Sequence, residues 1–164
     1  YGILPKKYAQ KGIPRKGDIV VSIGGRVGRD GIHGATFSSG ELTKRTITVN
    51  SQAVQIGNAI EEKRTFDAIL EARDQNCIRA ITDSGGGGLS SAIGEMGSEI
   101  GVTVQLKNER LKYQGLSPWE IWLSESQERM VLAIPKNKIK KFEKICKKYN
   151  VELSNLGTFD GSKK

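Results

Sequence analysis

The pattern of hydrophobic and polar positions divides the chain into short apolar runs and longer segments of helical periodicity. Apolar runs that end at glycine, proline or polar residues predict strands at residues 19–23, 47–49, 77–82, 102–106 and 130–134. Apolar residues at helical spacing predict helices at residues 59–74, 89–97 and 136–149, and a shorter helix is expected at 119–123. This order of elements predicts an α/β (α+β) domain, in which helices pack on a mixed β-sheet and cover mainly one side of it.

The same periodicity assigns faces to the predicted helices. In residues 59–74 three residues are expected to face inward: Phe66, Ile69 and Leu70. In residues 136–149 an apolar stripe is expected to face the core: Ile139, Phe142, Ile145, Cys146 and Tyr149. The short helix is expected to begin at a capping box, with Ser117 as N-cap, Pro118 at the first helical position and Glu120 at the third.

The chain divides into one domain with a polar segment at each end. Residues 1–16 are basic and interrupted by Pro5, Gly12 and Pro14, which is typical of a connector and is assigned to the link from a preceding domain. Residues 17–157 are predicted to form the domain, and residues 158–164 a polar tail. The chain starts without a methionine or a signal-peptide segment, so we expect it to be a piece of a longer protein.

The net charge of +8 is concentrated in one segment. Residues 136–149 contain seven lysines and one glutamate, so this segment contributes +6 of the total. The lysines surround the apolar stripe of a predicted helix, which a solvated helix face explains. No aromatic stacking platform is interleaved with them, as binding of single-stranded nucleic acid would require. We therefore expect no nucleic-acid partner.

Two further features of the composition bear on location. No apolar stretch approaches the length needed to cross a bilayer, so no membrane association is expected. Cys77 lies in an apolar run and Cys146 on an apolar helix face, where both are typical of small buried hydrophobic residues. This cysteine usage indicates a reducing compartment, and a cytoplasmic protein is expected.

The run Asp83-Ser84-Gly85-Gly86-Gly87-Gly88-Leu89 connects a predicted strand to a predicted helix that carries Leu89, Ala92, Ile93 and Met96 on one face. Backbone N–H groups at the start of a helix and the helix dipole together favour an anion, and glycines let the backbone approach it closely. The carboxylate of Asp83 would repel a bare phosphate, so a bridging Mg²⁺ ion is plausible. A tight turn without a ligand explains the same run, and this loop alone leaves both readings open.

Three other segments carry polar side chains suited to a ligand. Residues 25–36 place Arg26, Arg29, Asp30 and the only histidine, His33, among glycines; arginine suits phosphate or carboxylate, whereas a structural and a functional histidine are equally consistent with the pattern. Gln55 precedes a predicted helix and reads, by itself, as a surface or capping residue. Residues 124–129 form either an ordinary turn or a set of hydroxyl, carboxylate and amide groups for a ribose or a formamide.

Four segments occur in a fixed order: GRVGRDGIHGATFSS, VQIGNAIEEK, DSGGGGLSSAIGEM and SPWEIWLSESQERMVL. With them the chain, from about residue 17 to 157, resembles the C-terminal half-domain of the aminoimidazole ribonucleotide synthetase-like superfamily, a PurM C-terminal domain-like fold. Within that superfamily it resembles the phosphoribosylformylglycinamidine synthase family. The histidine loop and ESQERM are specific to this family, whereas the glycine-rich loop is shared with aminoimidazole ribonucleotide synthetase, selenophosphate synthetase, the hydrogenase maturation protein HypE and thiamine-monophosphate kinase.

The resemblance implies an ATP- and glutamine-dependent ligase of purine biosynthesis. In this family the amide oxygen of formylglycinamide ribonucleotide is phosphorylated, and ammonia then displaces the phosphate to give the amidine. The resemblance implies the following roles: substrate binding by Gln55, Glu125, Ser126, Gln127 and Arg29; phosphate binding by Gly85, Gly86, Gly87 and Gly88; a Mg²⁺ ligand at Asp83; and His33 near the substrate. The implied cofactors are Mg²⁺ and ATP, with the ATP site largely on other domains.

The family also implies parts that this sequence lacks. The main catalytic histidine is expected outside the chain, as are an N-terminal half-domain and a glutaminase domain or subunit that supplies ammonia. We therefore expect no turnover by this piece alone. Two alternatives stay open: a related ATP-dependent synthetase of the same superfamily, and a non-catalytic scaffold half-domain that docks a glutaminase subunit. The sequence also leaves open whether the parent is a long single chain or a short subunit.

Overall fold

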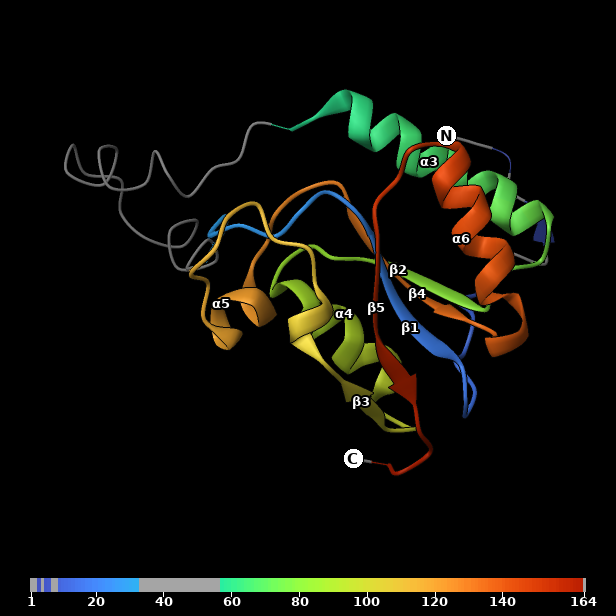
Figure 1. Ribbon diagram of the computed structural model, residues 1–164. Helices are drawn as coiled ribbons and strands as arrows, with labels where there is room; N and C mark the ends of the chain where they lie inside the picture. The colour runs from blue at the N-terminus through green and yellow to red at the C-terminus, as the bar shows by residue number, and fades with distance from the viewer. Residues whose placement is uncertain (1–2, 4, 7–8, 33–56, 164) are drawn as a thin grey trace.

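A computed structural model describes residues 3, 5–6, 9–32 and 57–163 of the chain (Figure 1). The described part contains five strands: β1 (Ile19–Gly24), β2 (Ala80–Asp83), β3 (Val102–Val104), β4 (Arg129–Ile134) and β5 (Leu153–Phe159). Its α-helices are α3 (Ala59–Asp74), α4 (Gly88–Gly97), α5 (Pro118–Leu123) and α6 (Ile139–Lys148). Two short 3₁₀ turns, η2 (Leu106–Asn108) and η3 (Lys136–Lys138), follow β3 and β4. The predicted strand at 47–49 lies outside the described residues.

The strands form one sheet in the order β2-β4-β1-β5-β3. The four pairings between these strands are antiparallel, so the predicted class, a sheet with helices packed on it, is confirmed, although a mixed sheet was expected. In the centre, Ile19 of β1 lies opposite Ile134 of β4, and Gly24 lies opposite Arg129. Strand direction depends on how the chain crosses over between elements, and the local hydrophobic pattern does not contain that information.

Helices cover both faces of the sheet, so the prediction that they cover mainly one side is wrong. Ile19, Val21 and Ile23 of β1 pack with α3 and α6 on one face, whereas Val20 packs with α4 and α5 on the other. Figure 1 shows these two pairs of helices on opposite sides of the strands. The signal was present in the sequence, because β1 reads IVVSIG without polar alternation, which is typical of a strand buried on both faces. All six of its residues are buried.

Helix α3 lies where it was predicted but packs through smaller residues than expected. The side chain of Asn58 caps its N-terminus by accepting hydrogen bonds from the N–H groups of Ile60 and Glu61, both at 3.2 Å. Its buried residues are Thr65, Ala68 and Ala72. The prediction that Phe66 faces inward is wrong, because its side chain is 56% exposed, and Ile69 and Leu70 are half-buried.

The other predicted helix faces are confirmed. The apolar residues assigned to the inner face of α4 are buried, and so are Phe142, Ile145 and Cys146 of α6. Both cysteines are free and buried, and burial raises the pKa of the Cys146 thiol to about 12. The capping box of α5 is present: a carboxylate oxygen of Glu120 accepts hydrogen bonds from the backbone N–H and the hydroxyl of Ser117.

The segments at both ends contact the domain. Strand β5 continues to Phe159, whose side chain is fully buried, so the residues from 158 that were predicted to be a polar tail begin inside a strand. Near the other end, Asp18 accepts hydrogen bonds from the backbone N–H of Arg15 at 2.8 Å and from the side chain of Arg79 at 2.5 Å. In the described part of the chain, none of the helices has both the length and the apolar character required to span a bilayer.

Candidate functional site

One edge of the sheet gathers most of the predicted site residues. Strands β1 and β2 end at this edge and β4 begins there, because Gly24 pairs with Arg129 and Asp83 pairs with Met130. The loops that follow β1 and β2, and the segment that precedes β4, therefore emerge side by side. Rigid strands that display loops at one edge are a common way to build a binding site.

A pocket of about 400 Å³ lies at this edge. Four predicted site residues from two segments line it: Asp83, Gly85, Glu125 and Gln127. Apolar side chains that the sequence analysis did not assign to a site also line it: Phe66 and Ile69 from α3, and Met130 from β4. The exposed position of Phe66, which contradicts its predicted burial, places it at this pocket. The pocket thus combines carboxylate and amide groups with an apolar wall.

The glycine-rich loop needs glycine at its last two positions. Gly87 and Gly88 have φ values of +78° and +58°, in the left-handed region that side chains rarely adopt. A Cβ atom on Gly88 would also clash with the carbonyl oxygen of Ser124, so the loop packs directly against the backbone that follows α5. These glycines are therefore required by local geometry, whether or not a ligand binds.

The N–H groups at the last two positions of this loop have partners within the protein. Gly87 donates to a carboxylate oxygen of Glu125 at 3.0 Å, and Gly88 donates to the carbonyl of Gly85 at 2.9 Å. The carboxylate of Glu125 thus lies at the N-terminus of α4, where the helix dipole favours a negative charge. An anionic ligand that used the Gly87 N–H would have to displace Glu125.

Asp83 is the last residue of β2 and is exposed at the pocket. Within the ranges that the structure describes, no three or more His, Cys, Asp and Glu side chains are grouped so that they could hold a metal ion. A single carboxylate still suits Mg²⁺, which is commonly bound by one or two carboxylates together with phosphate oxygens of a substrate. Asp83 therefore fits a metal that a bound phosphate also ligates, and does not form a metal site by itself.

Glu125, Ser126 and Gln127 do not all face the pocket. Glu125 and Gln127 line it, whereas Ser126 is buried between them. The Ser126 hydroxyl accepts a hydrogen bond from the N–H of Gly28 at 2.9 Å and donates to the carboxylate of Asp30. The structure therefore places Ser126 behind the pocket, where it connects the segment to the loop that follows β1.

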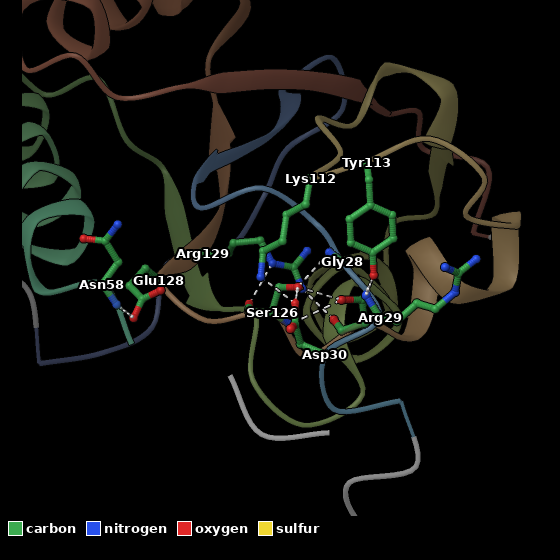
Figure 2. Close-up of polar contacts among 10 residues, drawn as sticks. Gly28, Arg29, Asp30, Asn58, Lys112, Tyr113, Ser126, Glu128 and Arg129 are labelled. Atoms are coloured by element: carbon green, nitrogen blue, oxygen red, sulfur yellow. Dashed lines mark hydrogen bonds and ion pairs between the residues drawn. The ribbon is translucent and has the colours of Figure 1, made fainter. Parts of the chain in front are cut away.

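Arg29 also contacts other parts of the protein instead of lining the pocket. Its Nε donates to the carboxylate of Glu120 at 2.6 Å and its Nη2 to the carbonyl of Gly115 at 2.8 Å. Its backbone N–H donates to the hydroxyl of Tyr113 at 2.9 Å (Figure 2). The hydrogen bond from Arg29 and those from Ser117 lower the pKa of Glu120 to about 2. Arg29 thus links the loop that follows β1 to the start of α5.

Sequence reasoning missed a polar cluster behind the pocket, which Figure 2 shows around Ser126. Asp30 accepts hydrogen bonds from Ser126 and, at 2.6 Å, from Lys112. Burial raises the pKa of Asp30, but these hydrogen bonds together with the positive charge of Lys112 hold it below its usual range. Arg129 is 3% exposed and donates to the backbone of residues 124–126. The one available signal for Arg129 in the sequence was a charged residue at the start of an apolar strand.

Two predicted site residues, His33 and Gln55, lie outside the described residues. The described chain resumes at Gly57, where an added Cβ atom would lie 3.1 Å from the side-chain oxygen of Gln127 and 3.0 Å from that of Glu128. The backbone N–H of the next residue, Asn58, donates to Glu128 at 2.8 Å. The start of α3 is therefore in contact with the segment that carries Gln127.

The chain is similar in sequence and in fold to known proteins. The PurL subunit of phosphoribosylformylglycinamidine synthase from Thermoplasma acidophilum is 44% identical over 146 residues, which cover 87% of this chain and 19% of that protein. The structure of Thermotoga maritima PurL complexed with FGAR matches with a TM-score of 0.79 at 30% identity. The match covers 92% of this chain and 25% of that protein's chain. The structure of the same protein complexed with ATP has a TM-score of 0.74 at 27% identity. That match covers 92% of this chain and 23% of the other.

The chain therefore spans about a fifth to a quarter of the length of these relatives. The family described as AIR synthase related protein, C-terminal domain, matches residues 15–164, nearly the whole chain. The chain belongs to the AIR synthase related protein family, as its C-terminal domain.

Proposed function

We propose that this chain is part of a phosphoribosylformylglycinamidine synthase and forms one wall of the site for formylglycinamide ribonucleotide (FGAR). One observation carries the proposal: Asp83, Gly85, Glu125 and Gln127, which come from separate segments of the sequence, line a single pocket. The PurL relatives, one of them solved with FGAR, support the same assignment.

The reaction would convert the amide of FGAR to an amidine. ATP phosphorylates the amide oxygen, and ammonia from glutamine then displaces the phosphate. In this proposal the Glu125 carboxylate accepts hydrogen bonds from substrate hydroxyl or N–H groups, and the Gln127 amide both donates and accepts. Ser126 acts from behind the pocket. Arg29, Gln55 and His33 stay predictions as residues near the substrate.

The proposed cofactors are Mg²⁺ and ATP. Asp83 would hold the metal together with phosphate oxygens, and a bound Mg²⁺ ion would neutralise charge on the transferred phosphoryl group. The loop from Gly85 to Gly88 would lie against a phosphate. The solved PurL complex with ATP supports ATP as the co-substrate, and we propose that most of its site lies on other domains. A glutaminase domain or subunit and an N-terminal half-domain are the proposed partners.

Calorimetric titration of FGAR into the full-length protein tests the proposal. Glu125→Gln and Gln127→Ala are expected to weaken FGAR binding about tenfold or more, because the first replaces a charged acceptor with a neutral amide and the second removes the amide from the pocket. Glu143→Gln on α6 and Gln105→Ala before η2 are matched controls, since both side chains are exposed and do not line the pocket. If all four variants bind FGAR as the wild type does, this pocket is not the substrate site.

One observation favours a second candidate, a non-catalytic scaffold that docks a glutaminase subunit. The N–H groups of Gly87 and Gly88 already have partners within the protein, so these two donors need no ligand. In a scaffold, Asp83→Asn and Gln127→Ala would leave the activity of the full-length protein near that of the wild type. A large loss of activity with unchanged circular dichroism would instead support the substrate site.

A further inference from the structure

Arg129 is a buried cation directly behind the pocket. It is the first residue of β4, and its side chain is 3% exposed. Among the described residues, no carboxylate forms an ion pair with it within 4 Å, unlike Arg26, Arg29 and Arg79. Burying an arginine without a direct ion pair is costly unless its N–H groups are used in hydrogen bonds. Among the described residues Nη1 has no hydrogen-bond partner, so the bonds made by Nε and Nη2 must offset the cost of burial.

The guanidinium of Arg129 binds two backbone carbonyls in the segment before β4. Its Nε donates to the carbonyl of Ser126 at 2.9 Å, and its Nη2 donates to the carbonyl of Ser124 at 2.5 Å. These carbonyls lie on either side of Glu125. Because the guanidinium is a rigid planar fork, two such bonds fix both the position and the direction of the backbone between them.

The backbone of Arg129 is itself fixed by the sheet. Arg129 pairs with Gly24 of β1, and its carbonyl accepts a hydrogen bond from the N–H of Ser84 at 3.1 Å. Through its guanidinium, Arg129 therefore holds residues 124–127 at a defined position relative to the sheet. Burial lowers the pKa of Arg129 below its usual value, and the charges of the more distant Glu109 and Asp30 offset this only in part.

The same segment is held from the other side through Ser126. Its hydroxyl contacts Asp30 and the N–H of Gly28, and the N–H of Glu125 donates to the carbonyl of Asp30 at 2.9 Å. With the backbone fixed in this way, the side chains on either side of the buried Ser126 face the pocket. The Glu125 carboxylate reaches the N–H of Gly87.

We propose that Arg129 is a positioning residue for ligand binding: by holding the carbonyls of Ser124 and Ser126, it directs Glu125 and Gln127 into the pocket. This inference rests on the proposed function for the identity of the ligand and adds a residue that contacts no substrate. Arg129 acts through Glu125 and Gln127, so its loss displaces them while leaving their chemistry intact. Displacement of groups by about 1 Å at a reacting centre lowers catalytic efficiency about 100-fold.

The test uses Arg129→Met and Arg129→Lys in the full-length protein. The methionine variant loses both carbonyl contacts, and we expect kcat/KM for FGAR to fall about 100-fold. Lysine keeps the positive charge but cannot bind both carbonyls through a planar guanidinium, so an intermediate loss of kcat/KM is expected. Added guanidinium ion is expected to restore part of the activity of Arg129→Met. Wild-type kinetics in both variants would overturn the proposal.

A second measurement separates positioning from loss of stability. Ile145→Ala removes buried side-chain volume from α6 on the opposite face of the sheet, so it lowers Tm without touching the segment. We expect it to leave KM for FGAR unchanged at a temperature where the protein is folded. If Ile145→Ala raises KM as much as Arg129→Met does, the effect of Arg129 is on stability alone and the proposal fails.

Amide hydrogen exchange at Gly87 gives a readout that needs no ligand. Its N–H is protected by Glu125, so Arg129→Met is expected to speed its exchange about tenfold, with core amides of β1 unchanged. Unchanged exchange at Gly87 overturns the positioning role even if FGAR binding is weaker. If the wild type does not bind FGAR but Gly87 exchange responds to Arg129, the proposed function fails and the positioning role stands.

Discussion

The glycine-rich loop, residues 84–88, and the polar segment, residues 124–127, meet at the same edge of the sheet but are held differently. The loop is shaped by backbone conformation, with two glycines at positive φ and main-chain hydrogen bonds. The segment is shaped by side chains, which fix it through Arg129, Asp30 and Ser126. A loop defined by glycines can recur in proteins that bind different ligands. A segment fixed by a specific buried cluster can present particular side chains, and we infer that ligand selectivity resides there.

The contact between the two regions should be the most sensitive point. Gly88→Ala places a Cβ atom against the carbonyl of Ser124 at a φ of +58°, so both strain and a clash oppose folding. We expect the free energy of unfolding to fall by about 3 kcal/mol, measured by chemical denaturation. Gly86→Ala is the matched control, because nothing lies within 4 Å of its added Cβ and its φ is not positive. Equal stability of the two variants would show that the regions do not pack as described.

The support of the polar segment should be the next most sensitive. Ser126→Ala leaves the buried N–H of Gly28 without its partner and removes one hydrogen bond from Asp30. We expect a loss of about 2 kcal/mol in the free energy of unfolding. Ser98→Ala, in an exposed serine at the end of α4, is expected to cost less than about 0.5 kcal/mol. If the two serine variants lose the same stability, the cluster behind the pocket does not hold the segment.

The sequence predicted the elements of this site better than their contacts. Helix α4 and strand β1 were predicted because each has a clear apolar pattern of its own. The position of Phe66 was not, because α3 packs through Thr65, Ala68 and Ala72, and the larger apolar residue was assumed to face inward. The grouping of Asp83, Glu125 and Gln127 came from the family resemblance.

The inward position of Ser126 and the role of Arg129 could not be predicted in the same way. Ser126 contacts Asp30 and Gly28, which are 96 and 98 residues away in the sequence, so no local pattern reports these contacts. The carbonyls that Arg129 binds are close in sequence, but their orientation depends on how α5 meets β4. Sequence patterns fix which face a residue takes within an element, whereas the junctions between elements depend on tertiary packing.

The link between Arg29 and Glu120 should appear as a pH dependence of stability. Arg29 and Ser117 lower the pKa of Glu120 from 4.5 to about 2 in the folded protein. A carboxyl whose pKa is lowered by folding contributes stability above its unfolded pKa and loses it as the pH falls toward the folded value. We therefore expect Tm of the wild type to drop more steeply than that of Glu120→Gln between about pH 4.5 and pH 2. Parallel curves for the two proteins would mean that this ion pair does not hold the loop to α5.

The smallest effect on stability is expected at the hydrogen bond between Gly87 of the loop and Glu125 of the segment. Glu125→Gln keeps an oxygen that can accept this hydrogen bond but removes the negative charge from the N-terminus of α4. The free energy of unfolding should therefore fall by only about 0.5 kcal/mol. Glu125→Ala also removes the acceptor, so the Gly87 N–H becomes available to an anion from solution.

Titration of inorganic phosphate then distinguishes the roles of the two regions. If the glycine-rich loop is itself an anion site, Glu125→Ala should bind phosphate more tightly than the wild type, even as FGAR binding weakens. If phosphate affinity does not change, the loop serves to support the segment, and the segment alone selects the ligand.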